Sequence, residues 1–204
     1  MVYGNRYLTQ DESDSNAYEF FSYMSTKGFS LNAISGMLGN IYMESGVNPG
    51  IWENLEEGNL EGGFGLVQWT PATNYINWAI EQGYSNYDKY GVLHPQMDRI
   101  LYEFNNGLQY IETDAYPLSA SEFMISDADP EYLAEVFLKN YERAGVEKLE
   151  ERKQWARYYY TTFKEVTPNP DVPSPDTPST KIRKSKFNFI LFNKRRRNQW
   201  IGKN

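Results

Sequence analysis

Residues 39–50 read GNIYMESGVNPG, and they carry the end of an apolar helix into a tight turn. Ser30 is placed to cap the start of this helix, while Gly46 and Pro49 interrupt helical backbone after its last turn. The spacing predicts an amphipathic helix with Glu44 in its final turn. Its apolar face is formed by Leu31, Ile34, Met37, Leu38 and Ile41.

Glu44 lies at the border of that apolar face. On a helical wheel it is about 20° from Met37 and about 60° from Ile41. The partial negative charge at the helix C-terminus and partial burial both disfavour an ionised carboxylate. Glu44 is therefore expected to hold a proton near neutral pH, as a general acid must. The alternative is a boundary glutamate that reaches for solvent.

A second stretch, residues 62–71, reads GGFGLVQWTP and surrounds one aromatic residue with glycines. Glycine allows a ligand to come close to the backbone. Gln68 interrupts an otherwise apolar run, and its amide is a candidate substrate contact. The alternative on pattern alone is a strand with one outward-facing polar residue.

The remaining sequence predicts a mainly α domain of six to seven helices with one small β-hairpin. Thr9 and Glu12 have the spacing of a capping box, and the first helix is expected to end at Gly28. Residues 46–67 are expected to form a turn followed by irregular or hairpin structure. Further helices are predicted from Thr70-Pro71 to Gly83, from Pro95, around 118–125, from Asp129-Pro130, and through Leu149, Trp155, Tyr159 and Phe163.

The chain divides into three parts by composition. Residues 1–166 form the predicted domain, and residues 167–180 hold five of the ten prolines, a density typical of an extended linker. Residues 181–204 contain nine Lys/Arg and no Asp/Glu, whereas the rest of the chain has 11 Lys/Arg against 27 Asp/Glu. Such opposite charges indicate different roles for the domain and the tail.

Composition also excludes several kinds of chemistry. The chain has no cysteine and a single histidine, His94, which is expected in a loop without a role. Thiol nucleophiles, Cys-type zinc sites and His-rich metal centres are therefore excluded, and no metal or cofactor is expected. Catalysis must rely on carboxylates, amides, hydroxyls and tyrosines. No apolar run approaches the roughly 18 residues that span a bilayer, and the first residues lack the pattern of a secretory signal.

Three blocks together resemble the phage tail-tip lysozyme family. They are Glu44–Pro49, Gly65–Trp69 and Asn140–Arg143, and the resemblance covers roughly residues 5–165. This family belongs to the lysozyme-like superfamily, with lytic transglycosylases and goose-type lysozymes as relatives. The chain is most similar to tail-associated peptidoglycan hydrolases of small podophages that infect Gram-positive bacteria.

The resemblance implies a glycosidase that cleaves the MurNAc–GlcNAc backbone of bacterial peptidoglycan. Glu44 matches the acid that protonates the glycosidic oxygen, Gly65 and Gln68 match the segment lining the cleft, and Tyr141 matches a cleft tyrosine. Core packing is the alternative for Tyr141. Aromatic faces stack well on sugar rings, so the nearby aromatic residues are further candidates. They are Trp52, which is included among the substrate-binding residues, and Phe64, Trp69, Tyr75 and Trp78.

The second catalytic group is left open by the sequence. Glycosidases usually pair two carboxylates, and Glu57 is the candidate chosen from Glu53, Glu56, Glu57 and Glu61. A positioned water or the 6-hydroxyl of the sugar could complete the reaction instead, so hydrolysis and transglycosylation to a 1,6-anhydro product both stay open. A glycan-binding module of a phage tail that does not cleave is the alternative from another class.

The basic tail interleaves nine cations with aromatic and aliphatic residues. An anionic wall polymer or membrane surface is the favoured partner of residues 181–204, because charge attraction and apolar burial act together there. Other phage tail proteins and nucleic acid are alternatives, as is a disordered solubilising tail. The expected location is the phage virion tail, acting on the host cell wall. The alternative is an endolysin held in the host cytoplasm before release.

Overall fold

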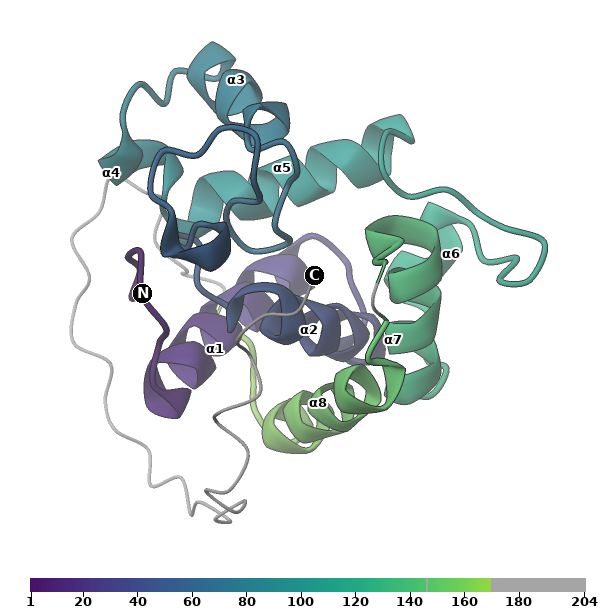
Figure 1. Cartoon of the computed structure of the whole chain (residues 1–204). Helices are drawn as coiled ribbons and strands as arrows, with labels where there is room; N and C mark the ends of the chain where they lie inside the picture. Colours follow the sequence, from purple (N-terminus) through teal and green to yellow (C-terminus); the bar gives the residue numbers. More distant parts are fainter. Residues whose placement is uncertain (146, 170–204) are drawn as a thin grey trace.

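The computed structural model describes residues 1–145 and 147–169 (Figure 1). Nearly all of the predicted linker and the whole basic tail therefore lie outside the described residues. The described part is mainly helical, which confirms the predicted fold class. Its elements are α1 (Gln10–Thr26), α2 (Leu31–Ser45), the 3-10 turn η1 (Glu53–Leu55), α3 (Thr73–Glu81), α4 (Tyr87–Tyr90), α5 (Leu93–Asn106), α6 (Ala120–Ile125), α7 (Pro130–Phe137), the π-helical turn η2 (Leu138–Glu142) and α8 (Leu149–Phe163).

Helix α2 is the centre of the molecule, with α1, α7 and α8 packed around it (Figure 1). Helices α3, α4 and α5 pack on one another and form a second group. The predicted apolar face of α2 is its core face, because Ile34, Met37, Leu38 and Ile41 are all fully buried. Burial on this scale stabilises the fold by about 1.5–3 kcal/mol for each large apolar side chain.

Two glycines inside α2 allow its neighbours to approach closely. A Cβ atom at Gly36 would lie 2.8 Å from the carbonyl carbon of Leu133 in α7. A Cβ atom at Gly39 would lie 2.8 Å from the backbone nitrogen of Ala156 in α8. These contacts offset the cost of about 1 kcal/mol that glycine carries in a helix. Both glycines are therefore explained by close packing in the core.

Several helix starts follow the predicted capping chemistry. The Thr9 hydroxyl accepts a hydrogen bond from the Glu12 amide, and the Glu12 carboxylate accepts one from the Thr9 amide. Ser30 accepts from the Ala33 amide at 3.0 Å. Asp129 caps α7 by accepting from the Glu131 amide at 3.0 Å. Each of these caps satisfies a backbone donor that the first helical turn leaves without a partner.

Two other helix starts differ from the prediction. Thr70 does not cap α3: its hydroxyl donates to the Gln68 carbonyl, the Thr70–Pro71 peptide is cis, and α3 begins at Thr73. Helix α5 begins at Leu93 rather than Pro95, since proline is tolerated in a first turn that needs no amide donor. His94 therefore lies in a helix, not a loop. It is buried, and its Nε2 lies 3.1 Å from the Glu19 carboxylate.

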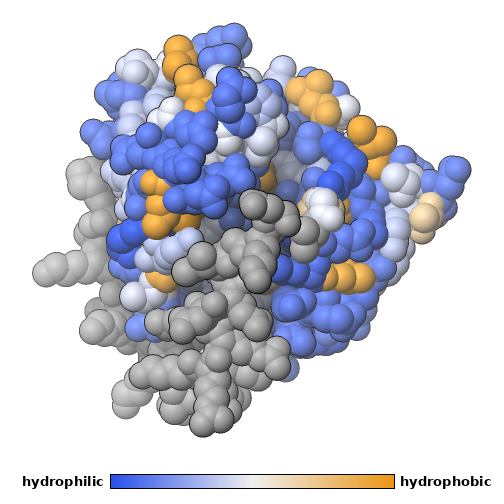
Figure 2. All heavy atoms as spheres, in the orientation of Figure 1, coloured by the Kyte–Doolittle hydropathy of each residue, from blue (hydrophilic) through white to orange (hydrophobic). Residues whose placement is uncertain are grey.

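The predicted hairpin is reduced to single bridges in the described part of the chain. Phe64 makes one antiparallel bridge to Trp52 and another to Trp69. The short α4, η1 and η2 are additions that the sequence pattern did not predict. On the face shown in Figure 2, hydrophilic residues predominate and apolar residues form separate small patches. Within residues 1–145 and 147–169, no helix combines the length and apolar character needed to cross a bilayer.

Candidate active site

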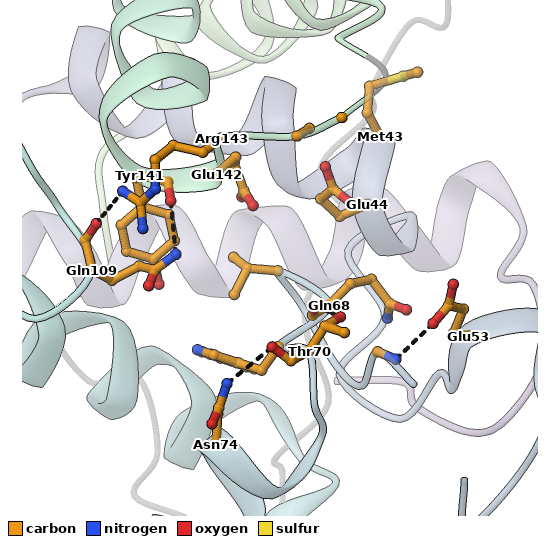
Figure 3. A pocket seen from close by; sticks show the side chains of 15 residues that line it. Met43, Glu44, Glu53, Gln68, Thr70, Asn74, Gln109, Tyr141, Glu142 and Arg143 are labelled. Atoms are coloured by element: carbon orange, nitrogen blue, oxygen red, sulfur yellow. Dashed lines mark hydrogen bonds between the residues drawn. The ribbon is translucent and has the colours of Figure 1, made fainter. Parts of the chain in front are cut away.

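A cavity of about 540 Å³ opens at the C-terminal end of α2 (Figure 3). Its walls come from the end of α2, from η1 and the loop that leads to α3, and from η2 and the segment that follows it. Three carboxylate side chains, Glu44, Glu53 and Glu142, reach it from three different elements. The lining is completed by Met43, Gly63, Val67, Gln68, Trp69, Thr70, Asn74, Gln109, Tyr141, Arg143, Ala144 and Gly145.

Glu44 lies in the last turn of α2, as predicted. The helix ends because Gly46 adopts a left-handed conformation with φ 64° and donates its amide to the Tyr42 carbonyl. The Glu44 side chain keeps 20% exposure, and its Oε1 accepts from Arg152 Nη2 at 2.6 Å. A guanidinium in this position favours the charged form of a carboxylate. The sequence argument for a protonated Glu44 did not include this contact.

Arg152 of α8 is buried and held by a fixed set of acceptors. Its Nε donates to the Glu147 carbonyl at 2.7 Å, and its Nη1 donates to Asn40 Oδ1 at 3.1 Å. The Asn40 amide donates in turn to the carbonyls of Gly36 and Ala134. The guanidinium is therefore oriented by three helices before it meets Glu44.

Glu142 ends η2 and has no such cation. The residue is half-buried, but its Oε1 is fully buried and has no hydrogen-bond partner. Burial raises the pKa of Glu142 well above its usual range, and the charge of Glu44 acts in the same direction. Arg152 and Arg143 oppose this shift. The surroundings of Glu142 thus favour its protonated form.

A fully buried glutamate, Glu103 of α5, supports the walls of the cavity. Its carboxylate accepts from Trp69 Nε1 at 3.0 Å, from Arg99 Nε at 2.8 Å and from the Tyr141 hydroxyl. Burial raises the pKa of Glu103, while the hydrogen bond from Tyr141 and the charge of Arg99 lower it. Two residues that line the cavity, Trp69 and Tyr141, are fixed in this way by one carboxylate.

The loop around Gly65 is fastened to the end of α2. Ser45 Oγ donates to the Leu66 carbonyl at 2.8 Å, and the Leu66 amide donates to Gln96 Oε1 at 2.8 Å. Gly65 has φ +80°, and a Cβ atom there would lie 2.5 Å from Gln96 Oε1, so glycine is required. Gln68 folds back in the same loop and donates to the Gly65 carbonyl at 2.9 Å. The serine after Glu44 therefore sets the distance between the helix end and the loop.

The cavity brings together three of the residues singled out from the sequence, namely Glu44, Gln68 and Tyr141. Gly65 lies behind the cavity wall, and Trp52 is buried against Phe64 with their ring centroids 4.5 Å apart. Neither belongs to the lining.

Glu57 is exposed and also lies outside the lining. Its charge, together with burial, raises the pKa of Tyr87 to about 12, so it acts on another part of the surface. From the same acidic segment it is Glu53 that reaches the cavity, where it accepts from the Gly63 amide at 2.8 Å. Among the described residues, no group of His, Asp and Glu is arranged to hold a metal ion.

The sequence interpretation missed Arg152, Glu142 and Glu103. Arg152 carried a usable signal, because it shares the buried stripe of α8 with Ala156 and Tyr159 at helical spacing, where a charged residue needs a partner. Glu103 lies next to the apolar positions of α5 and gave a weaker signal. Glu142 stands in the block that the resemblance singled out for its tyrosine.

A helical fold built around α2, with a carboxylate-lined cavity at its end, fits a lysozyme-like domain. Residues 15–163 match the family model described as phage tail lysozyme, and the chain belongs to this family. Over 158 residues, or 78% of this chain, it is 43% identical to Morphogenesis protein 1 of Bacillus phage B103. The match spans 42% of that relative's length.

Proposed function

We propose that this protein is a glycosidase that cleaves the MurNAc–GlcNAc backbone of bacterial peptidoglycan, with Glu44 as the general acid. The observation that carries the proposal is the position of Glu44. Its carboxyl group enters a cavity of about 540 Å³ from the end of the central helix and is held there by a buried guanidinium. A fixed carboxyl in a partly water-excluded cavity is what proton donation to a leaving group requires.

In the proposed reaction, Glu44 donates its proton to the glycosidic oxygen as the C1–O bond breaks, which releases the leaving sugar as an alcohol. Charge then develops on C1 and its ring oxygen. In hydrolysis, water adds to C1 and its released proton restores Glu44. In transglycosylation, the 6-hydroxyl of the same sugar adds to C1, and its proton returns to Glu44 to leave a 1,6-anhydro product.

The position of the other side chains divides the proposed substrate contacts into two groups. Gln68 lines the cavity and stays partly exposed, so it is proposed to contact the glycan directly. Tyr141 also lines the cavity, but its side chain is buried and its hydroxyl donates to Glu103, so it is proposed to support the wall. Gly65 and Trp52 lie behind the lining, and we propose that they support the loop that carries Gln68. Glu57 is not proposed to act on the sugar, because Glu53 is the carboxylate of that segment that reaches the cavity.

The relative from Bacillus phage B103 is named as a morphogenesis protein, which agrees with a component of the virion. We propose that the chain acts from the phage tail on the host cell wall, and an endolysin released late in infection is the alternative. The tail of residues 181–204, with nine Lys/Arg and no Asp/Glu, is proposed to bind anionic wall polymers or membrane surfaces, and other tail proteins are alternative partners.

Mass spectrometry of the products from purified walls tests the proposed activity. The intact chain is expected to release soluble muropeptides that end in MurNAc. A reducing end identifies a hydrolase and a 1,6-anhydro end identifies a transglycosylase. Products that end in GlcNAc would contradict the assigned bond. Binding to the walls without any soluble product would instead support a glycan-binding module that does not cleave.

A further inference from the structure

The cavity holds one carboxyl group that the proposed reaction does not use. Glu142 lines the same cavity as Glu44, and both side chains are directed into it in Figure 3. Oε1 of Glu142 is buried and has no hydrogen-bond donor in the described part of the chain. Leaving a charged oxygen buried and unpaired is far more costly than leaving a neutral carboxyl there. The geometry therefore favours a proton on Glu142.

Within the described residues, neither of the cations near Glu142 forms an ion pair with it. The three guanidinium nitrogens of Arg152 donate hydrogen bonds to the Glu147 carbonyl, to Asn40 and to Glu44. Arg143 Nη1 donates to the carbonyls of Gln109 at 2.7 Å and Asn140 at 2.8 Å. Arg152 thus pairs with Glu44, and residues 1–145 and 147–169 give Glu142 no ion pair of its own.

The groups that act on Glu142 come from every element around the cavity. Glu44 at the end of α2 and Glu103 of α5 are negative, and Glu53 of η1 lines the cavity as well. Arg152 of α8 and Arg143 after η2 are positive. Burial raises the pKa of Glu142, and Glu44 is the strongest of the neighbouring charges that act on it. Since such coupling is mutual, a charge on Glu142 also disfavours a charge on Glu44.

We propose that Glu142 is a positioning residue that works through Glu44, the two carboxyl groups sharing one proton beside Arg152. The inference rests on the proposed role of Glu44 as the acid. Arg152 stabilises the charge that Glu44 carries after its proton has passed to the glycan. Glu142 is a second carboxyl without its own cation. The pair of carboxyl groups therefore keeps its last proton to a higher pH than Glu44 would if Glu142 were absent.

The pH profile of the Glu142→Gln variant tests this role. Glutamine keeps the shape of a protonated glutamate but cannot ionise, so the proton-sharing is lost. Wild-type activity on purified walls is expected at the acid end of the profile. The alkaline fall in activity is expected to begin about one pH unit lower or more. Glu151→Gln, which removes an exposed charge at the start of α8 outside the cavity, is the matched control and should leave the profile unchanged.

Two results would overturn the proposal. One is a Glu142→Gln profile that superimposes on the wild-type profile. The other is an equal loss of activity at every pH, which would indicate a structural role only.

A direct titration keeps the proposal testable if Glu142→Gln does not fold. Carboxyl ¹³C NMR of the wild type should show a glutamate that titrates above the usual range, and this resonance should titrate at lower pH in Glu44→Gln. The same titration in both proteins would contradict the coupling. An inactive Glu44→Gln with an unshifted Glu142→Gln profile would remove the role of Glu142 and leave the proposed function intact. A fully active Glu44→Gln would remove the proposed function itself.

Discussion

Glu44 and Glu142 each lie in the last turn of a helical segment and face the same cavity, yet their surroundings differ in one decisive respect. Glu44 at the end of α2 receives a guanidinium nitrogen of Arg152 at 2.6 Å. Glu142 at the end of η2 has a buried oxygen with no donor. The first environment favours a charged carboxylate, and the second favours a proton.

The comparison shows that a position at a helix end does not decide the charge of a glutamate. The partial negative charge of a helix C-terminus is worth only about 0.3–1 kcal/mol at an exposed site. A buried guanidinium or complete burial of an oxygen outweighs it. Active sites commonly place two carboxyl groups in different surroundings, so that one stays protonated while the other is charged.

The largest effect is expected from removal of the cation. Arg152→Met leaves the Glu44 carboxylate and Asn40 Oδ1 without their donor. It should lower the free energy of unfolding by about 3 kcal/mol, the lower end for breaking a buried pair, since Glu44 keeps 20% exposure. Chemical denaturation monitored by circular dichroism measures the change.

The neighbouring Lys153→Met is the matched control for that variant. Lys153 pairs with Glu135 at a more exposed site, where 24% and 22% of the side chains are accessible, and its loss should cost no more than about 1 kcal/mol. If Arg152→Met and Lys153→Met lower the free energy of unfolding equally, the buried ion pair of Arg152 contributes no more to stability than the more exposed pair of Lys153. Combining Arg152→Met with Glu44→Gln should recover part of the loss, because the uncompensated charge is removed.

The next largest effect is expected from the contact that brings α8 against α2. Gly39→Ala introduces a Cβ atom 2.8 Å from the Ala156 backbone nitrogen, and it should cost about 1–3 kcal/mol of stability by overpacking. It should also displace Arg152 from Glu44 and lower activity at every pH. Thermal denaturation checks the first effect. Gly145→Ala, where nothing lies within 4 Å of the added atom, is the control for stability.

A smaller effect concerns stability as a function of pH. The pKa of Glu142 is raised in the folded state, so the folded protein binds the proton more tightly than the unfolded chain. Stability from this group is fully present below the unfolded pKa and is lost as pH rises through the folded pKa. Wild type should therefore lose on the order of 1 kcal/mol more than Glu142→Gln across that window, the cost of one unpaired buried group.

That difference is measured by denaturation of both proteins at a series of pH values. Taking the difference between the two proteins cancels the titration of other groups such as Glu103. If the two curves of stability against pH are parallel, Glu142 binds its proton equally tightly in the folded and unfolded states.

The smallest effect is expected at Glu53, the exposed carboxylate of the cavity. The amide oxygen of Glu53→Gln can still accept from Gly63, so stability should change by no more than about 0.5 kcal/mol. The alkaline fall in activity should stay where it is in the wild type. A shift as large as that of Glu142→Gln would mean that the shared proton is not confined to Glu44 and Glu142.

The features that were predictable from sequence are those set by local chemistry. The caps at Thr9, Ser30 and Asp129 depend on residues three or fewer positions away, and the apolar face of α2 depends on helical spacing. The Glu44 helix end followed from the same kind of signal. The capping pattern at Thr70-Pro71 did not start a helix, because the Thr70 hydroxyl donates to the Gln68 carbonyl and α3 begins at Thr73.

The unpredicted part of the site depends on residues far apart in the chain. Arg152 meets Glu44 across 108 positions, and Tyr141 meets Glu103 across 38. The spacing of one helix can show that a charged residue faces inward, but it cannot show which residue it meets. The same limit explains why the sequence offers Glu57, one of four carboxylates in a loop, as the second carboxyl and does not single out Glu142.

The central claim is that Glu44 donates the proton, and the rate of muropeptide release by Glu44→Gln tests it most directly. The variant should fold and bind purified walls like the wild type, because glutamine still accepts from Arg152. Its release rate at the optimal pH should fall by about 10²–10⁴, the range attributed to general acid catalysis. Release at the wild-type rate by a correctly folded Glu44→Gln would contradict the account.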